Sequence, residues 1–198
     1  METSFKQTTS NKVERYRLFL PQFELLISDE KEEISVLANT AAALREAFGF
    51  FWVGFYLVKD GQLILGPFQG STACYRIHKG KGVCGTSWAE ARTLIVPNVE
   101  QFPGHIACSS LSRSEIVVPI LANGQVKGVL DIDSDDLGGF DETDARFLEE
   151  IGTNDFAVLS VFFLKSVRYG FFSHNVSESR FYEREYDSRF TIAHFFAS

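Results

Sequence analysis

Three cysteines are the clearest candidates for chemistry in this chain. Cys74, Cys84 and Cys108 lie within one 35-residue stretch that is rich in glycine. A thiolate is a good nucleophile, and a cysteine oxidised to a sulfenic acid is reset when a second thiol attacks it and forms a disulfide. Such a cycle needs two cysteines that can meet and an external dithiol that reduces the disulfide. The alternative is that each cysteine is a small buried hydrophobic residue, and spacing alone favours that alternative.

Acidic and aromatic residues form a second group of candidates. Asp131 and Asp133 are two residues apart on a predicted strand, so their side chains point to one face of it. When two carboxyl groups lie so close together, the pKa of one of them rises, which favours a proton donor near neutral pH. Trp52 and Tyr56, four residues apart on another predicted strand, also share a face. The alternatives are an exposed polar face for the aspartates and core packing for the aromatic rings.

Composition and charge exclude several classes of protein. The 198 residues suit one compact domain, and 19 Lys plus Arg against 26 Asp plus Glu leave no basic footprint for nucleic acid. The longest apolar run has ten residues, Gly49 to Val58, whereas a membrane-spanning helix needs about 20. The N-terminal residues carry no apolar signal core, so we expect a cytoplasmic protein. The cysteines and four histidines lack zinc-site spacing, so no metal is expected.

The helices that must support these residues can be read from hydrophobic periodicity. The pattern predicts three long helices, over residues 13–28, 34–48 and 141–162. Pro21 divides the first helix or opens a second turn. Asp29 and Glu32 resemble a capping box before the second helix, and Asp141 opens the third.

The strands are joined mainly as hairpins. Apolar and β-branched runs predict strands over residues 50–58, 63–65, 94–96, 115–121 and 126–133. Asp60-Gly61 and Asn123-Gly124 are hairpin turns, and residues 84–91 suit a short helix. We therefore predict an α+β fold, a single domain whose mainly antiparallel central sheet has N- and C-terminal helices packed against it.

Domain boundaries follow from composition. Residues 1–12 are polar and expected to be frayed, and residues 13–164 form the domain. Residues 165–198 form an aromatic-rich tail without a clean period, for which the sequence predicts no structure.

The segments around the cysteines and strands carry long, ordered motifs. They are Trp52-Val53-Gly54-Phe55-Tyr56, Gly66-Pro67-Phe68-Gln69-Gly70, Ala73-Cys74, Gly82-Val83-Cys84-Gly85, Phe102-Pro103-Gly104-His105-Ile106-Ala107-Cys108, Ser114-Glu115-Ile116-Val117-Val118-Pro119 and Gly128-Val129-Leu130-Asp131-Ile132-Asp133. Over about residues 13–162 the chain resembles the free methionine-(R)-sulfoxide reductases, enzymes built on a GAF domain. It departs from them at Ser109, where the family has an acidic residue, and in the tail after residue 164.

The resemblance implies divided roles for the thiols. Cys108 would be the catalytic thiol, Cys74 the main resolving thiol and Cys84 an auxiliary one. Direct resolution requires the α-carbons of Cys74 and Cys108 to approach within about 7 Å. His105 would lower the pKa of Cys108, or is a plain loop histidine. The implied external reductant is a dithiol such as thioredoxin, with no bound cofactor.

The resemblance also implies where the substrate binds. It places free methionine sulfoxide among Trp52, Tyr56, Glu115, Asp131 and Asp133. Carboxylates can pair with the α-ammonium group, and a protonated carboxyl can help the sulfoxide oxygen leave. An aromatic face could hold the S-methyl group and favour positive charge on sulfur.

Glu115 raises a geometric problem for such a pocket. A symmetric turn at Asn123-Gly124 pairs Glu115 with Ile132 and places it on the face opposite the two aspartates. A shared pocket therefore requires an odd-length loop or a bulge. Pro119 cannot donate a ladder hydrogen bond, which favours a bulge or an edge position. We predict such an irregularity in this hairpin.

The alternative function is a non-catalytic GAF-type sensor for a small ligand such as a cyclic nucleotide. Phe140-Asp141-Glu142 resembles part of a motif of cyclic-nucleotide-binding GAF domains, although a helix start explains it better. The sequence leaves the oligomeric state open, with a homodimer as one alternative.

Overall fold

The protein is described by a computed structural model that covers residues 4–6, 8–106 and 108–152. Its elements are α1 (Lys12–Ile27), α2 (Glu33–Phe48), β1 (Trp52–Lys59), β2 (Gln62–Gln69), β3 (Arg76–His78), α3 (Gly82–Glu90), β4 (Leu94–Val96), η1 (Val99–Gln101), β5 (Ser114–Ala122) and β6 (Gln125–Ser134). Residues 142–152 form a further helix. None of the described helices is long and apolar enough to cross a membrane.

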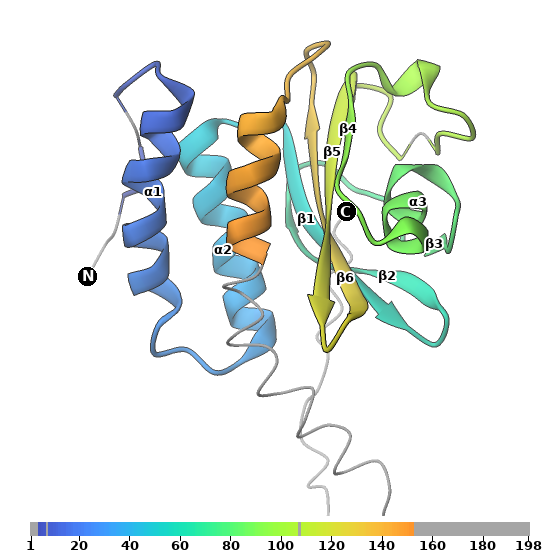
Figure 1. The fold of residues 1–198 in the computed structure, drawn as a ribbon, viewed down its shortest axis with the longest axis horizontal. Helices are drawn as coiled ribbons and strands as arrows, with labels where there is room; N and C mark the ends of the chain where they lie inside the picture. The colour runs from blue at the N-terminus through green and yellow to red at the C-terminus, as the bar shows by residue number, and fades with distance from the viewer. Residues whose placement is uncertain (1–3, 7, 107, 153–198) are drawn as a thin grey trace, which may run out of the picture.

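A six-stranded antiparallel sheet in the order β3-β2-β1-β6-β5-β4 forms the middle layer. Helix α2 and the 142–152 helix cover one face of the sheet, and α1 lies outside them (Figure 1). Helix α3 and the loops around it lie on the opposite face (Figure 1). The predicted α+β fold is confirmed, whereas the three-residue strand β3 and the short helix η1 were not predicted.

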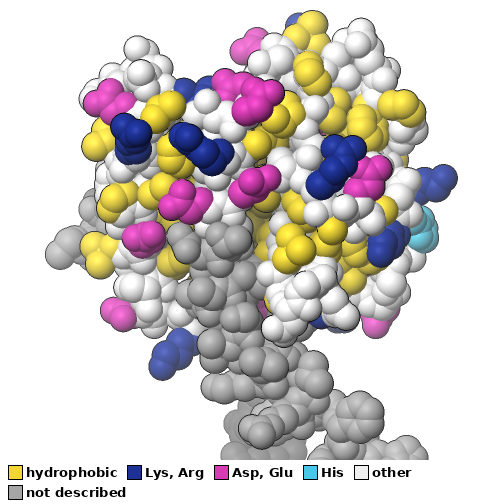
Figure 2. Space-filling view, in the orientation of Figure 1, with side chains coloured by type: hydrophobic (Ala, Val, Ile, Leu, Met, Phe, Trp, Pro, Cys, Tyr) yellow, Lys and Arg dark blue, Asp and Glu magenta, His cyan; other side chains and the backbone are white. Residues whose placement is uncertain are grey.

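The sheet separates two hydrophobic cores. The larger core lies under the helical layer, where Phe19, Leu44 and Phe55 are fully buried. The smaller one lies under α3, and it includes Trp52 and Tyr56 from the other face of β1. Successive residues of a strand point to opposite faces, so β1 contributes to both cores. Figure 2 views the helical layer and the α3 side edge-on, and on this side of the molecule acidic and basic side chains are interspersed rather than gathered by sign.

Helix α1 differs from the prediction at Pro21, because it continues without a break from Lys12 to Ile27. Pro21 is exposed, while Phe19 and Phe23 on either side of it are buried. Burial of this apolar face outweighs the one hydrogen bond that proline cannot make. The N-terminal segment also differs from a frayed chain at Phe5, whose ring packs 5.4 Å from that of Phe19 and is 4% exposed.

The second and last helices begin in different ways. The predicted capping box before α2 is wrong, because Glu32 makes no capping bond with its side chain. Glu30 instead accepts hydrogen bonds from the backbone of Lys31 and Glu32. Asp141 caps the last helix as predicted, with its Oδ1 2.7 Å from the amide of Thr143. The predicted end of that helix at residue 162 and the 165–198 tail lie outside the described residues.

Candidate active site

A pocket of ≈ 530 Å³, part of it open to solvent, lies between α3 and the sheet. The N-terminus of α3, strands β1, β3, β5 and β6, and loop residues 72, 73, 105, 106, 108, 109 and 112 line it. Of the eight site residues predicted from the sequence, seven line this pocket: Trp52, Tyr56, Cys84, Cys108, Glu115, Asp131 and Asp133. The eighth, Cys74, is joined to Cys108.

Cys74 and Cys108 form a disulfide whose α-carbons are 5.3 Å apart. This lies within the distance that direct resolution requires. Both residues are partly exposed, Cys74 just before β3 and Cys108 in the loop that leads to β5. The two cysteines that must meet in a thiol cycle therefore do so at the pocket, with one of them in its wall.

Cys84 takes no part in the disulfide. It lies in the first turn of α3, is 4% exposed and has its Sγ 3.8 Å from Oε1 of Glu115. Burial, followed by the nearby Asp131 and Glu115 charges, raises its pKa well above the usual range. Cys84 is therefore a thiol rather than a thiolate at neutral pH, and a role as attacking nucleophile is unfavourable there.

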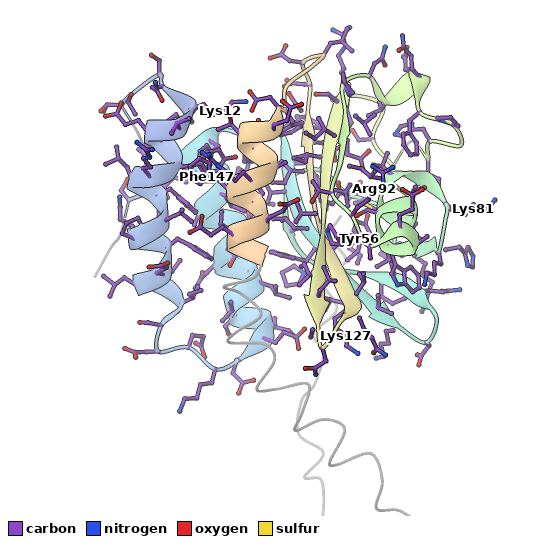
Figure 3. All side chains as sticks on the ribbon, viewed as in Figure 1. Lys12, Tyr56, Lys81, Arg92, Lys127 and Phe147 are labelled. Atoms are coloured by element: carbon purple, nitrogen blue, oxygen red, sulfur yellow. A yellow bond between two sulfur atoms is a disulfide. The ribbon has the colours of Figure 1, made fainter. Side chains whose placement is uncertain are left out.

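Strand register explains how the three acids share one face. Glu115 pairs with Asp133 rather than with Ile132, because the β5–β6 ladder shifts by one residue between Ile120 and Leu121. The extra residue is Lys127 on β6, which Figure 3 shows near the hairpin end of that strand. The predicted irregularity is confirmed, and without it Glu115 would face the helical layer.

Pro119 lies in β5 of the same hairpin, at a position where no strand pairs with the outer edge of β5, so its missing N–H group costs no hydrogen bond on that side. Strand β4 pairs with β5 only over residues 115–117, so β5 is an edge strand where Pro119 lies. The edge position predicted for Pro119 is therefore also present.

Burial dominates the electrostatics of the acids. It raises the pKa of Asp131 from 3.8 to about 6 and the pKa values of Glu115 and Asp133 well above their usual range. Mutual repulsion adds to the rise for Glu115 and Asp133, each of which feels the charge of Asp131. The cluster therefore retains protons near neutral pH, as a general acid must.

Trp52 and Tyr56 form the aromatic wall and also hold the loop that carries Cys74. Their ring centroids are 6.3 Å apart, and each is less than 4% exposed. Trp52 Nε1 donates to the carbonyl of Ser71 at 2.9 Å, and the Tyr56 hydroxyl donates to the carbonyl of Cys74 at 3.1 Å. The sequence left core packing and substrate contact as alternatives for Trp52 and Tyr56, whereas the two rings both pack in the smaller core and line the pocket.

The Trp52 ring lies where two glycines leave room. A β-carbon on Gly54 or on Gly70 would come within 2.3 Å of ring atoms of Trp52. Gly54 pairs with Asp131 across β1 and β6, so the ring lies over the strand pair that carries the acid. Both glycines lie within the motifs that carry the family resemblance, and the close approach of the Trp52 ring explains why a residue without a β-carbon is needed at each position.

His105 lines the pocket, but burial lowers its pKa from 6.5. It is therefore mainly neutral at neutral pH, which argues against a histidine cation beside Cys108. The sequence did not single out Ser112, which lines the pocket and hydrogen-bonds to Asp133. Nor did it assign a site role to Lys81 and Gly82 at the start of α3, although Gly82 lies in one of the motifs named above. The close spacing of Gly80, Gly82 and Gly85 was the signal in the sequence that could have indicated the turn before α3.

Comparison with known proteins places this site in a family. A family model described as a GAF domain matches residues 30–154, which include all eight predicted site residues. GAF domain-containing protein A of Dictyostelium discoideum is 55% identical over 152 residues, 76% of this chain and 96% of that protein. The free methionine-R-sulfoxide reductase of Escherichia coli strain K12 is 44% identical over 142 residues, 71% of this chain and 86% of that enzyme.

A solved structure agrees with these sequence matches. The free methionine-R-sulfoxide reductase from Neisseria meningitidis, in complex with its substrate, has a TM-score of 0.75 and 51% identity. The alignment covers 82% of this chain and 96% of that one. The chain belongs to the free methionine-R-sulfoxide reductases. In this reductase-family GAF domain, Cys108 of the disulfide and the three acids line the pocket described above.

Proposed function

We propose that the protein reduces free L-methionine (R)-sulfoxide to L-methionine. The observation that carries the proposal is the Cys74–Cys108 disulfide at a pocket lined by three carboxyl groups, of which Glu115 and Asp131 are buried. The reaction needs a nucleophile for sulfur, a proton for the departing oxygen and a second thiol for resolution, and the pocket supplies all three. The choice of the R epimer and of the free amino acid as substrate follows the names of the related enzymes.

The thiols divide the work in two steps. In the reduced enzyme, the Cys108 thiolate attacks the sulfoxide sulfur while a carboxyl group protonates the oxygen. The oxygen passes to Cys108 as a sulfenic acid, and methionine leaves with its sulfur reduced by two electrons. Cys74 then attacks the sulfenic sulfur, which forms the disulfide and releases the oxygen as water. One sulfoxide and two thiols thus give one methionine, one disulfide and one water.

Pocket position supports the choice of Cys108 as the attacking thiol. Cys108 is in the pocket wall, whereas Cys74 is not, although the two are bonded. Tyr56 holds the Cys74 carbonyl, which keeps the resolving thiol beside the sulfenic acid. Cys84 remains an auxiliary thiol in this scheme, and it must leave its buried position before it can resolve anything.

The acids and aromatic rings account for substrate binding. At least one ionised carboxylate among Glu115, Asp131 and Asp133 pairs with the α-ammonium group, and a protonated one supplies the proton. The raised pKa values make such a mixed state available near neutral pH. In this scheme, the rings of Trp52 and Tyr56 form the wall of the pocket against which the S-methyl group packs.

The rest of the cycle uses an external reductant. We propose thioredoxin, because a dithiol protein can reach a partly exposed disulfide and no bound cofactor is then required. A cytoplasmic enzyme would meet such a reductant.

A sensor role is less well supported. Asp141, the residue behind the likeness to cyclic-nucleotide-binding domains, caps the last helix and pairs with Lys12 at 2.9 Å. These bonds explain it without a ligand.

A coupled assay tests the proposal. It follows NADPH oxidation with thioredoxin and thioredoxin reductase, and it offers each epimer of free methionine sulfoxide and a blocked methionine sulfoxide peptide. We expect turnover with the free R epimer alone. Equal turnover of the peptide, or none with any substrate, would reject the proposed activity.

A further inference from the structure

Cys84, Glu115 and Asp131 converge from three different elements, α3, β5 and β6. One sulfur and two carboxylate oxygens, one from each residue, all lie within 4.8 Å of one another. Cys84 Sγ and Glu115 Oε1 are 3.8 Å apart, and all three residues are buried. A helix and two paired strands fix them, so their convergence does not depend on a loop.

One atom of this cluster lacks a partner. Asp131 is only 7% exposed, and its Oδ1 atom is buried and accepts no hydrogen bond. None of the ion pairs found among the described residues reaches the three side chains. Arg113, two residues before Glu115, is exposed, and so is Lys81, three residues before Cys84, which points away from the body of the protein (Figure 3). A buried acidic group without a compensating charge is unfavourable, and a cation would relieve it.

We propose that Cys84, Glu115 and Asp131 form a binding site for a thiophilic divalent cation, best represented by Zn²⁺. Zinc bonds of about 2.3 Å to sulfur and about 2.0 Å to oxygen place the two ligand atoms about 3.5 Å apart in a tetrahedron. The observed 3.8 Å needs only a small inward shift. Three protein ligands leave a fourth position on the pocket side for water.

The ligand set selects among cations. A thiolate ligand favours Zn²⁺, Co²⁺ or Cd²⁺, whereas Mg²⁺ and Ca²⁺ prefer sites made of oxygen alone. The binding step exchanges the Cys84 thiol proton for a sulfur–metal bond and involves no electron transfer. The sequence predicts no metal because these ligands are far apart along the chain and only the bulged hairpin brings the two acids to one face.

The site lies in the wall of the pocket that the proposed function assigns to the substrate. A bound cation would therefore exclude the substrate ammonium group, and this consequence rests on the proposed function. The cation site itself stands independently of any reductase activity.

Direct binding to the oxidised, full-length protein tests the proposal. The chain has three cysteines, so the Cys74–Cys108 disulfide leaves Cys84 as its single free thiol. Calorimetric titration with Zn²⁺ is compared for the wild type, Cys84→Ser, Asp131→Asn and the exposed control Asp136→Asn. The absorption spectrum of the Co²⁺-loaded wild type reports a sulfur ligand without any substitution.

We expect one Zn²⁺ per chain, bound equally well by Asp136→Asn and in the presence of excess Mg²⁺. Cys84→Ser and Asp131→Asn should each weaken binding by more than about 100-fold, beyond the loss seen for outer-shell partners. The Co²⁺ form should show thiolate-to-metal charge transfer. The proposal is overturned by absent Zn²⁺ binding in the wild type, by unchanged affinity in Cys84→Ser, or by a Co²⁺ spectrum without the thiolate band.

Discussion

Replacing Asp131 by asparagine should stabilise the protein at alkaline pH while it damages the site. Burial raises the pKa of Asp131 from 3.8 to about 6. The native state therefore binds this proton more tightly than the unfolded chain does, and the free energy of unfolding falls as pH rises through that window. At 1.36 kcal/mol per pH unit, the ionised carboxylate costs the native state on the order of 3 kcal/mol above about pH 6. Asparagine keeps the shape and removes that cost.

Denaturant unfolding of the oxidised protein measures this difference. We expect Asp131→Asn to exceed wild type by up to about 3 kcal/mol near pH 8 and by almost nothing near pH 3, where the carboxyl is mostly protonated in both states. A chelator in the buffer excludes any metal contribution. Asp136→Asn, an exposed neighbour, serves as the matched control. A gain of the same size at both pH values, or lower stability of Asp131→Asn near pH 8, would show that the carboxylate is not the destabilising group.

Three further predictions concern the surroundings of the site. Gly54→Ala should displace the Trp52 ring and destabilise the protein by about 1–3 kcal/mol, seen as a red shift of tryptophan emission and a lower Tm; unchanged emission and Tm would contradict the close approach. Tyr56→Phe removes the hydrogen bond to Cys74, worth about 1 kcal/mol, and should slow disulfide formation in stopped flow while single-turnover methionine release persists; an unchanged rate would contradict a tethering role. Truncation after residue 164 should leave turnover intact, since no candidate site residue follows it; a folded but inactive truncation would refute this.

Local signals in the sequence predicted most of the fold. Asp60-Gly61 and Asn123-Gly124 mark both hairpins, since each turn requires positive φ at its two residues, and all four have it. Even the bulge between β5 and β6 followed from parity, because Glu115 and Asp133 share a face only if one residue is extra. Such arguments succeed where a period or a turn alone decides the geometry.

Tertiary contacts limit what could be predicted. Pro21 and the residues before α2 were misjudged because local rules ignore the burial of Phe19 and Phe23 and the competing bonds of Glu30. The hydroxyl of Tyr56 bonds to a carbonyl 18 residues away, which no periodicity indicates. The isolation of Cys84 from the disulfide likewise depends on how α3 packs on the sheet.

Single-turnover methionine release from cysteine variants tests the central claim most directly. Reduced protein is mixed with free methionine (R)-sulfoxide without a reductant, and the methionine formed per chain is counted. We predict no release from Cys108→Ser, because a hydroxyl is a far poorer nucleophile at neutral pH. Cys74→Ser should release up to one methionine per chain and then stall as a sulfenic acid or pass slowly to Cys84. A burst that persists in Cys108→Ser and vanishes in Cys74→Ser would reverse the two roles, and methionine release equal to that of the wild type in both variants would show that neither thiol attacks the sulfoxide.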